Sequence, residues 1–167
     1  MFSSRDPEVI RERLGAEGYQ RAQRTRELLR NPQPLTEADA AVLRAAAAPL
    51  LLRDLAATRM PVPDIRTEAH EDRPWAVCGW IAGRGVTGQG VWVMRDGSPA
   101  DQVRELAEQF QSWASDVLVG AGQSPEWPLC PEHDRGHGLM ADVRDGAAVW
   151  VCLHPDHVIA PIGALTR

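Results

Sequence analysis

The sequence predicts an α+β fold: N-terminal helices, a small antiparallel sheet packed by an amphipathic helix, and a C-terminal β hairpin. Three observations predict it. Apolar residues recur at helical spacing before residue 60 and again over 98–119, period-two alternation marks strands from Pro61 onward, and an Asp-Gly turn joins two further alternating runs. These patterns divide the chain into an N-terminal helical region (1–60), a β-sheet plus helix core (61–121) and a tail (122–167).

The composition is that of a globular protein with a hydrophobic core. Hydrophobic residues make up 44% of the 167 residues and charged residues 25%, a balance typical of folded soluble chains. No apolar run approaches the ~20 residues that span a bilayer, and the first residues lack the apolar core of a signal peptide. The sequence therefore predicts a cytoplasmic protein that makes no use of a membrane.

The first predicted helix begins at Asp6, an N-cap residue followed by Pro7 at the first helical position. Gly15 and Gly18 weaken its middle, because glycine loses more backbone freedom in a helix than other residues lose. The segment is predicted as one loose helix or as two pieces. Its thin apolar stripe consists of Val9, Ile10, Leu14, Leu28 and Leu29.

A second helix is predicted after Thr36, which has Asp39 three residues later in the pattern of a capped start. Alanine and leucine favour the helix that follows. Pro49 removes a backbone donor and its ring clashes with the preceding turn. A kink or a break is therefore expected near Ala48.

Strands are predicted at 75–82 and 90–94 from their aromatic and β-branched residues, with a third at 62–70. The turn from Gly83 spells G-x-G-x-x-G, but a dinucleotide site needs a helix N-terminus after the glycines. A strand follows here, so the turn is predicted to be a hairpin connector. Cys78, inside an apolar strand, is predicted to be a small buried hydrophobic residue.

The strongest helical pattern lies at 98–119. Ser98 and Pro99 open it, Asp101 places a negative charge in its first turn, and Gly120 can close it. The apolar face is predicted to pack on the preceding strands as core. Its members are Val103, Leu106, Ala107, Phe110, Trp113, Ala114, Val117 and Leu118.

The tail follows the linker GQSPEWP and is predicted to be a tight hairpin. Asp145-Gly146 is a favoured two-residue turn between the runs at 139–143 and 147–151. A last strand is predicted at 157–163. Counting outward from the turn, Arg144 faces Ala147, Leu139 faces Cys152 and His137 faces His154.

The tail also gathers potential metal ligands. Because side chains alternate along a strand, His137, Cys152 and His154 are expected on one face at the open end of the hairpin. Cys130 and His133 can fold over that face as a knuckle. Zinc takes four Cys or His ligands in a tetrahedron, so six candidates compete for four places: Cys130, His133, His137, Cys152, His154 and His157.

A Cys-x-x-His knuckle, a hairpin and a further cysteine are the layout of a zinc-ribbon-like module with substituted ligands, and we expect a structural zinc ion there. A metal-free tail and a catalytic or transported metal are the alternatives. An odd cysteine count in a reducing compartment argues against a disulfide framework.

Three stretches of the tail carry a resemblance: WPLCPEHDRGHGL, AAVWVCL and VIAPIGAL. They are similar to the tail of short uncharacterised actinobacterial proteins, which reads roughly W-P-x-C-P-x-H, H-x-L and V-W-x-C-P. The resemblance covers about residues 75–165. It implies a zinc-ribbon-like tail whose ligands are Cys130, His133, His137 and Cys152. This chain departs from the pattern because Leu153 stands where proline is usual. His154 and His157 are additional to the four matched ligands. The resemblance carries no activity.

No catalytic residue is predicted. The chain contains no G-x-S-x-G elbow, P-loop lysine or H-E-x-x-H helix. Two thiolate ligands favour a structural zinc site in which protein side chains fill all four coordination positions. Acidic residues near a zinc knuckle, here Glu132, Asp134 and Asp156, more often face solvent than act in catalysis. The run His70 to Asp72 is read as a polar loop because adjacent side chains point in different directions.

The sequence favours a non-enzymatic adaptor or regulatory protein that binds another protein, because six tryptophans exceed what a small core needs. One alternative is a nucleic-acid-binding zinc-ribbon protein. The tail (126–167) has three arginines against six acids, which disfavours phosphate binding, and only Arg21, Arg24 and Arg26 could form a basic patch. The other alternative is a zinc-dependent hydrolase.

Overall fold

The computed structural model describes residues 15–16, 19–20, 23, 27, 36–41, 43, 47–68, 76–83, 88–133 and 136–166. The described residues of the first predicted helix, such as Tyr19 and Gln23, have helical backbone. The predicted start at Asp6 and Pro7, the arginine patch and the polar run at 70–72 lie outside the described residues. None of the described helices is both long and apolar enough to cross a membrane.

Within the described residues from 36 to 63, two short helices precede the first sheet, α2 (Glu37–Ala41) and α3 (Ala48–Ala57). Helix α3 accommodates Pro49 in its first turn, where the missing N–H costs no hydrogen bond. Ala47, just before the helix, has right-handed helical backbone with φ −87° and ψ −48°, and residues 44–46 lie outside the described residues, so the predicted kink or break near Ala48 stays a prediction. α3 buries Leu51 and Leu55 completely.

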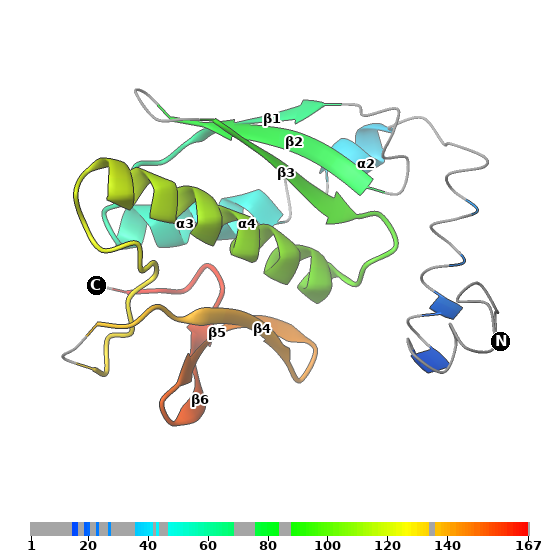
Figure 1. Ribbon diagram of the computed structural model, residues 1–167. Helices are drawn as coiled ribbons and strands as arrows, with labels where there is room; N and C mark the ends of the chain where they lie inside the picture. Colours follow the sequence, from blue (N-terminus) through cyan, green and yellow to red (C-terminus); the bar gives the residue numbers. More distant parts are fainter. Residues whose placement is uncertain are drawn as a thin grey trace, which may run out of the picture.

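The upper sheet in Figure 1 consists of β1 (Asp64–Glu68), β2 (Ala76–Ala82) and β3 (Gln89–Met94), antiparallel in the order β1-β2-β3. All three lie within or close to the predicted strands. Strand β3, and not a helix, follows the glycine turn, as the hairpin interpretation requires. The face toward the helices carries Ile65, Val77, Ile81, Val91 and Val93.

Helix α4 (Pro99–Gly120) lies between the upper sheet and a lower one (Figure 1). The Ser98 hydroxyl accepts a hydrogen bond from the Asp101 amide at 3.1 Å, which confirms the predicted cap. The apolar face is buried, with Phe110 and Trp113 fully inaccessible to solvent. Burial of two aromatic side chains contributes several kcal/mol, of order 1.5–3 kcal/mol for each.

Polar side chains of α4 close the open edge of β3. The Gln109 amide accepts from the Trp92 N–H at 2.8 Å and donates to the Trp92 carbonyl at 2.6 Å. Gln102 donates to the Met94 carbonyl at 2.9 Å, and Glu105 accepts from the Met94 N–H at 3.1 Å. The helix thereby occupies backbone groups that would otherwise invite pairing with another strand.

The lower sheet consists of β4 (Met140–Arg144), β5 (Ala147–Leu153) and β6 (Asp156–Pro161), in the order β4-β5-β6. The C-terminal part is therefore a three-stranded antiparallel sheet. Asp145 and Gly146 have positive φ of 51° and 75° at the turn, as a primed hairpin turn requires. The predicted pairing of Arg144 with Ala147 is confirmed.

The β4–β5 ladder ends at the pair of Met140 with Val151. Upstream of Met140 the chain pairs with residues 128–130 instead: the Leu139 N–H donates to the Pro128 carbonyl at 2.8 Å, and the Cys130 N–H to the His137 carbonyl at 2.9 Å. The hairpin count therefore holds as far as Met140. Beyond it, the predicted pairs of Leu139 with Cys152 and of His137 with His154 are not part of the β4–β5 ladder.

One hydrophobic core joins α3, α4 and both sheets, and its members come from all three predicted regions of the chain. At its base Asp54, a fully buried carboxylate of α3, accepts hydrogen bonds from Trp150 Nε1 at 2.7 Å and from the Gly163 and Leu165 amides at 2.6 and 2.9 Å. Trp127 Nε1 also donates to the Thr58 hydroxyl at 2.8 Å. These bonds fasten the lower sheet to α3.

Candidate metal centre

The first half of the site is the turn from Cys130 to His133. Cys130 Sγ lies 3.2 Å from His133 Nδ1. Burial raises the pKa of the Cys130 thiol above 9.0, and nearby Cys152 adds to that effect. The backbone amide of Glu132 acts in the opposite direction because it donates to the sulfur and so favours the thiolate.

The second half brings together His137 and Cys152. His137 Nε2 lies 3.2 Å from Cys152 Sγ, and His133 Nδ1 lies 3.7 Å from the same sulfur. His137 is positioned by the short pairing of residues 128–130 with 137–139, and Cys152 by the end of β5. The His154 amide donates to Cys152 Sγ at 3.2 Å.

Each cysteine of the site therefore accepts a hydrogen bond from the backbone amide two residues later, Glu132 for Cys130 and His154 for Cys152. Amide donors of this kind stabilise a charged sulfur. Sequence reasoning missed this feature. The sequence could have indicated these hydrogen bonds only through the turn that must follow each cysteine.

The four candidate ligand atoms of Cys130, His133, His137 and Cys152 all lie within 4.8 Å of one another. Around a tetrahedral zinc, with sulfur near 2.3 Å and nitrogen near 2.0–2.1 Å, neighbouring ligand atoms are about 3.3–3.8 Å apart. Small side-chain movements suffice to reach that spacing. The cluster could hold a metal ion such as zinc, and it is the only cluster of its kind in the part of the chain that the structure describes.

The two other histidines of the tail lie outside the four-residue cluster. The His154 ring packs edge-on to the His137 ring, with centroids 5.4 Å apart. His157 places Nε2 2.7 Å from the Glu132 carboxylate and Nδ1 2.6 Å from the Pro155 carbonyl. The Pro155 carbonyl, and then Glu132, raise the pKa of His157 above 6.5.

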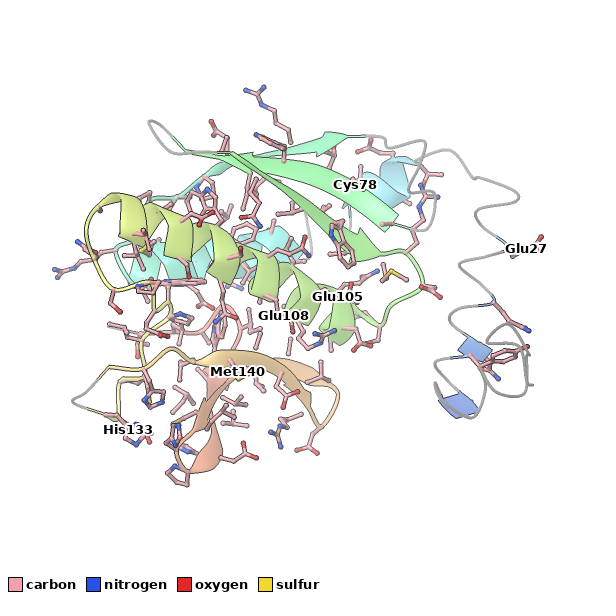
Figure 2. The ribbon with its side chains drawn as sticks, viewed as in Figure 1. Glu27, Cys78, Glu105, Glu108, His133 and Met140 are labelled. Carbon is pink, nitrogen blue, oxygen red and sulfur yellow. The ribbon has the colours of Figure 1, made fainter. Side chains whose placement is uncertain are left out.

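The site has a buried side and an accessible side. The Cys130 side chain is 4% exposed and that of Cys152 is not exposed, whereas His133 and His137 are half-buried. In Figure 2 His133 lies at the outer end of the lower sheet, far from Cys78 in the upper sheet. Cys78 is buried, as predicted, and does not belong to the cluster.

The acids that could have served a catalytic metal make other contacts. The Glu132 carboxylate pairs with His157, and the Asp156 carboxylate lies 3.1 Å from the Arg144 guanidinium. Asp134 lies outside the described residues. No carboxylate of the described residues belongs to the ligand cluster.

No protein-family model, curated protein or solved structure matches the chain. The functional interpretation of the site therefore depends on the geometry of the cluster.

Proposed function

We propose that the chain binds one structural zinc ion through Cys130, His133, His137 and Cys152, and that the sheet it stabilises is a zinc-ribbon-like, protein-binding part of a cytoplasmic adaptor or regulatory protein. The observation that carries the zinc proposal is the convergence of four soft or borderline ligand atoms within 4.8 Å. Two thiolates and two imidazoles suit zinc, whereas calcium and magnesium require oxygen ligands.

A structural role fits this ligand set better than catalysis does. Four protein ligands fill a tetrahedron, whereas a catalytic zinc keeps one position open for water. The two described acids that the sequence suggested, Glu132 and Asp156, pair with His157 and Arg144 and so are not placed as a general base. The hydrolase alternative therefore has no supporting contact among the described residues.

The outer face of the lower sheet supports the protein-binding part of the proposal. Met140, Leu153 and Val158 are each about half exposed, at 51%, 50% and 47%. Met140 and Val158 both pair with Val151, and Leu153 follows Val151 by two residues, so all share one face. Exposed apolar side chains gathered on one face are typical of interaction surfaces.

A groove of about 440 Å³ runs along the same face. It is lined by apolar Met140, Val151 and Leu153 and by charged Arg104, Glu108 and Asp142. A surface that mixes apolar and charged side chains in this way suits a peptide or loop that contributes an apolar side chain. Glu108 and Met140 are labelled in Figure 2 on the facing sides of α4 and β4.

Elemental analysis of the purified protein tests the zinc proposal. We expect one zinc per chain, no stoichiometric zinc in Cys130→Ser or Cys152→Ser, and full occupancy in Cys78→Ala as the matched control. Cobalt substitution should give the spectrum of a tetrahedral site with two thiolates. Equal metal content in the wild type and Cys152→Ser would refute the proposed site.

Substitutions on the apolar face test the protein-binding role. A partner recovered with the wild type is purified and its Kd is measured against the double variant Met140→Asp, Leu153→Asp. We expect affinity to fall about tenfold or more, equal to about 1.4 kcal/mol. Val119→Asp, at an equally exposed apolar position on α4, should bind as the wild type does. Unchanged affinity of the double variant would count against this face.

A further inference from the structure

The inference concerns His154, which lies beside the metal centre and outside its four-ligand set. Its ring stands edge-on to that of His137 at a centroid distance of 5.4 Å and an interplanar angle of 85°. Its backbone amide is hydrogen-bonded to Cys152 Sγ at 3.2 Å. The main chain of His154 is therefore fixed against one ligand while its side chain lies against another.

Solvent reaches the imidazoles of the site more readily than it reaches the thiols. Both sulfurs are buried, the imidazoles of His133 and His137 are half-buried, and the His154 side chain is exposed. A hydrated ion arriving from solvent thus meets imidazole nitrogens before it meets thiols. Of these imidazoles His154 is the most accessible, and it is in contact with the ligand ring behind it.

His157 does not have the same freedom. Its two ring nitrogens are held by the Glu132 carboxylate and the Pro155 carbonyl at 2.7 and 2.6 Å. To coordinate a metal it would have to break both contacts. Among the described residues, no hydrogen bond engages a ring nitrogen of His154, so rotation of its side chain breaks no such bond.

We propose that His154 is an exchangeable ligand of the metal centre: it binds the incoming divalent ion at the mouth of the site and passes it to His137. In the exchange, a nitrogen–metal bond to His154 breaks as the bond to His137 Nε2 forms. Water ligands leave to solvent, as do the thiol protons that the metal displaces. The inference rests on the proposed zinc site.

The same geometry makes His154 a substitute ligand. If the His137 imidazole is removed, the space it occupied opens toward the ring that packs against it. The His154 side chain can then rotate into that space while its amide stays on Cys152. The centre would keep two sulfurs and two nitrogens, at the cost of affinity.

The first arm of the test measures how fast cobalt(II) binds to the metal-free full-length chain, followed by thiolate-to-metal absorption in stopped flow. We expect His154→Ala to keep the wild-type spectrum and stoichiometry and to bind about tenfold more slowly, an effect as large as the smaller ones that groups outside the primary ligands have on metal affinity or activity. His157→Ala is the matched control and should bind at the wild-type rate. Equal rates for the wild type and His154→Ala would overturn entry through His154.

The second arm compares His137→Ala with the double variant His137→Ala, His154→Ala. We expect the single variant to retain a tetrahedral cobalt spectrum with two nitrogens and the double variant to lose one nitrogen ligand and about tenfold more affinity. Identical spectra and affinities would overturn the substitute role. A wild type without a tetrahedral thiolate spectrum would instead refute the zinc proposal, and this inference with it.

Discussion

At the scale of single residues, Asp54 does the most to join distant parts of the chain. Its carboxylate is fully buried and accepts hydrogen bonds from Trp150, Gly163 and Leu165, about a hundred residues further along. A buried carboxylate is tolerated only where such donors surround it. Nothing in the local pattern of α3 marks this aspartate, because its partners have no sequence relation to it.

Asp54→Ala should destabilise the protein severely. The substitution leaves the buried Trp150 indole N–H and the half-buried Gly163 and Leu165 amides without their acceptor. A buried donor without a partner costs about 1–3 kcal/mol, and the two half-buried amides add to that cost, so we expect the free energy of unfolding to fall by about 3 kcal/mol. Urea denaturation measures it. Asp64→Ala, an exposed carboxylate on β1, is the control and should change stability by less than about 0.5 kcal/mol. A loss no greater than the control's would contradict the role of Asp54.

Asp142 gives a residue-scale prediction for pH. Its pKa is lowered from 3.8, first by the hydrogen bond from the Val143 amide and then by the Arg144 guanidinium. A depressed folded-state pKa contributes stability above the unfolded value, and this contribution is lost as pH falls through the folded pKa. We therefore expect Asp142 to stabilise the fold at neutral pH and to stop doing so in acid below its usual pKa.

An NMR titration of the Asp142 carboxyl, repeated in Arg144→Ala, separates the two causes. The pKa should rise in the variant but stay below 3.8, because the Val143 amide still donates to the carboxylate. A wild-type pKa at or above 3.8 would contradict the assignment.

At the scale of elements, α4 holds both sheets through glutamines. Gln109 occupies the Trp92 backbone at the β3 edge, and Gln111 donates to the Trp127 and Leu139 carbonyls at 3.0 and 2.7 Å. The amphipathic pattern of the helix predicts only that its glutamines lie outside the hydrophobic core. It does not predict that they bind sheet edges on two sides.

Gln109→Leu should expose the β3 edge. We expect the free energy of unfolding to fall by about 1–2 kcal/mol, because the Trp92 N–H and carbonyl lose their partners. Hydrogen exchange at the Trp92 amide should accelerate. Ser112→Leu, an exposed helical position on the same helix, should leave that amide as protected as in the wild type. Unchanged protection at Trp92 in Gln109→Leu would show that the edge is closed in another way.

The elements themselves were largely predictable because their signals are local. Alternation located the strands, the Ser98 cap and apolar face located α4, and Asp145-Gly146 fixed the β4–β5 register. The short pairing of residues 137–139 with residues 128–130 was not predictable, because no local pattern marks it.

Two different arguments predicted the ligand cluster, hairpin counting and the family resemblance. Counting along the hairpin selected Cys152, but it also placed His154 on the same face and could not separate it from His137. The resemblance selected His137. The structure brings these two rings into contact and puts His137 in the cluster, which a count of residues has no means to show.

At the scale of the whole molecule, the lower sheet does not depend on metal alone. Its Trp150, Cys152 and Leu139 belong to the same core as α3 and α4. Trp150 also meets Trp127 edge-on at 5.6 Å, and Asp54 holds its indole. Zinc is therefore expected to secure the two loops at the end of the sheet rather than to create the fold.

Removal of zinc should consequently loosen one end of the molecule. We expect a chelator to accelerate hydrogen exchange at residues 128–138 and 152–157, while strands β1 to β3 keep their protection because their contacts lie in the shared core. The free energy needed to open these two loops should fall by about 2.7 kcal/mol relative to protein in free zinc at a hundred times its Kd. Exchange that accelerates equally in β2 would show that the metal governs the entire fold, and exchange that does not change anywhere would show that the centre holds no metal of structural consequence. The contrast between the two sheets thus measures how far the influence of the centre extends into the molecule.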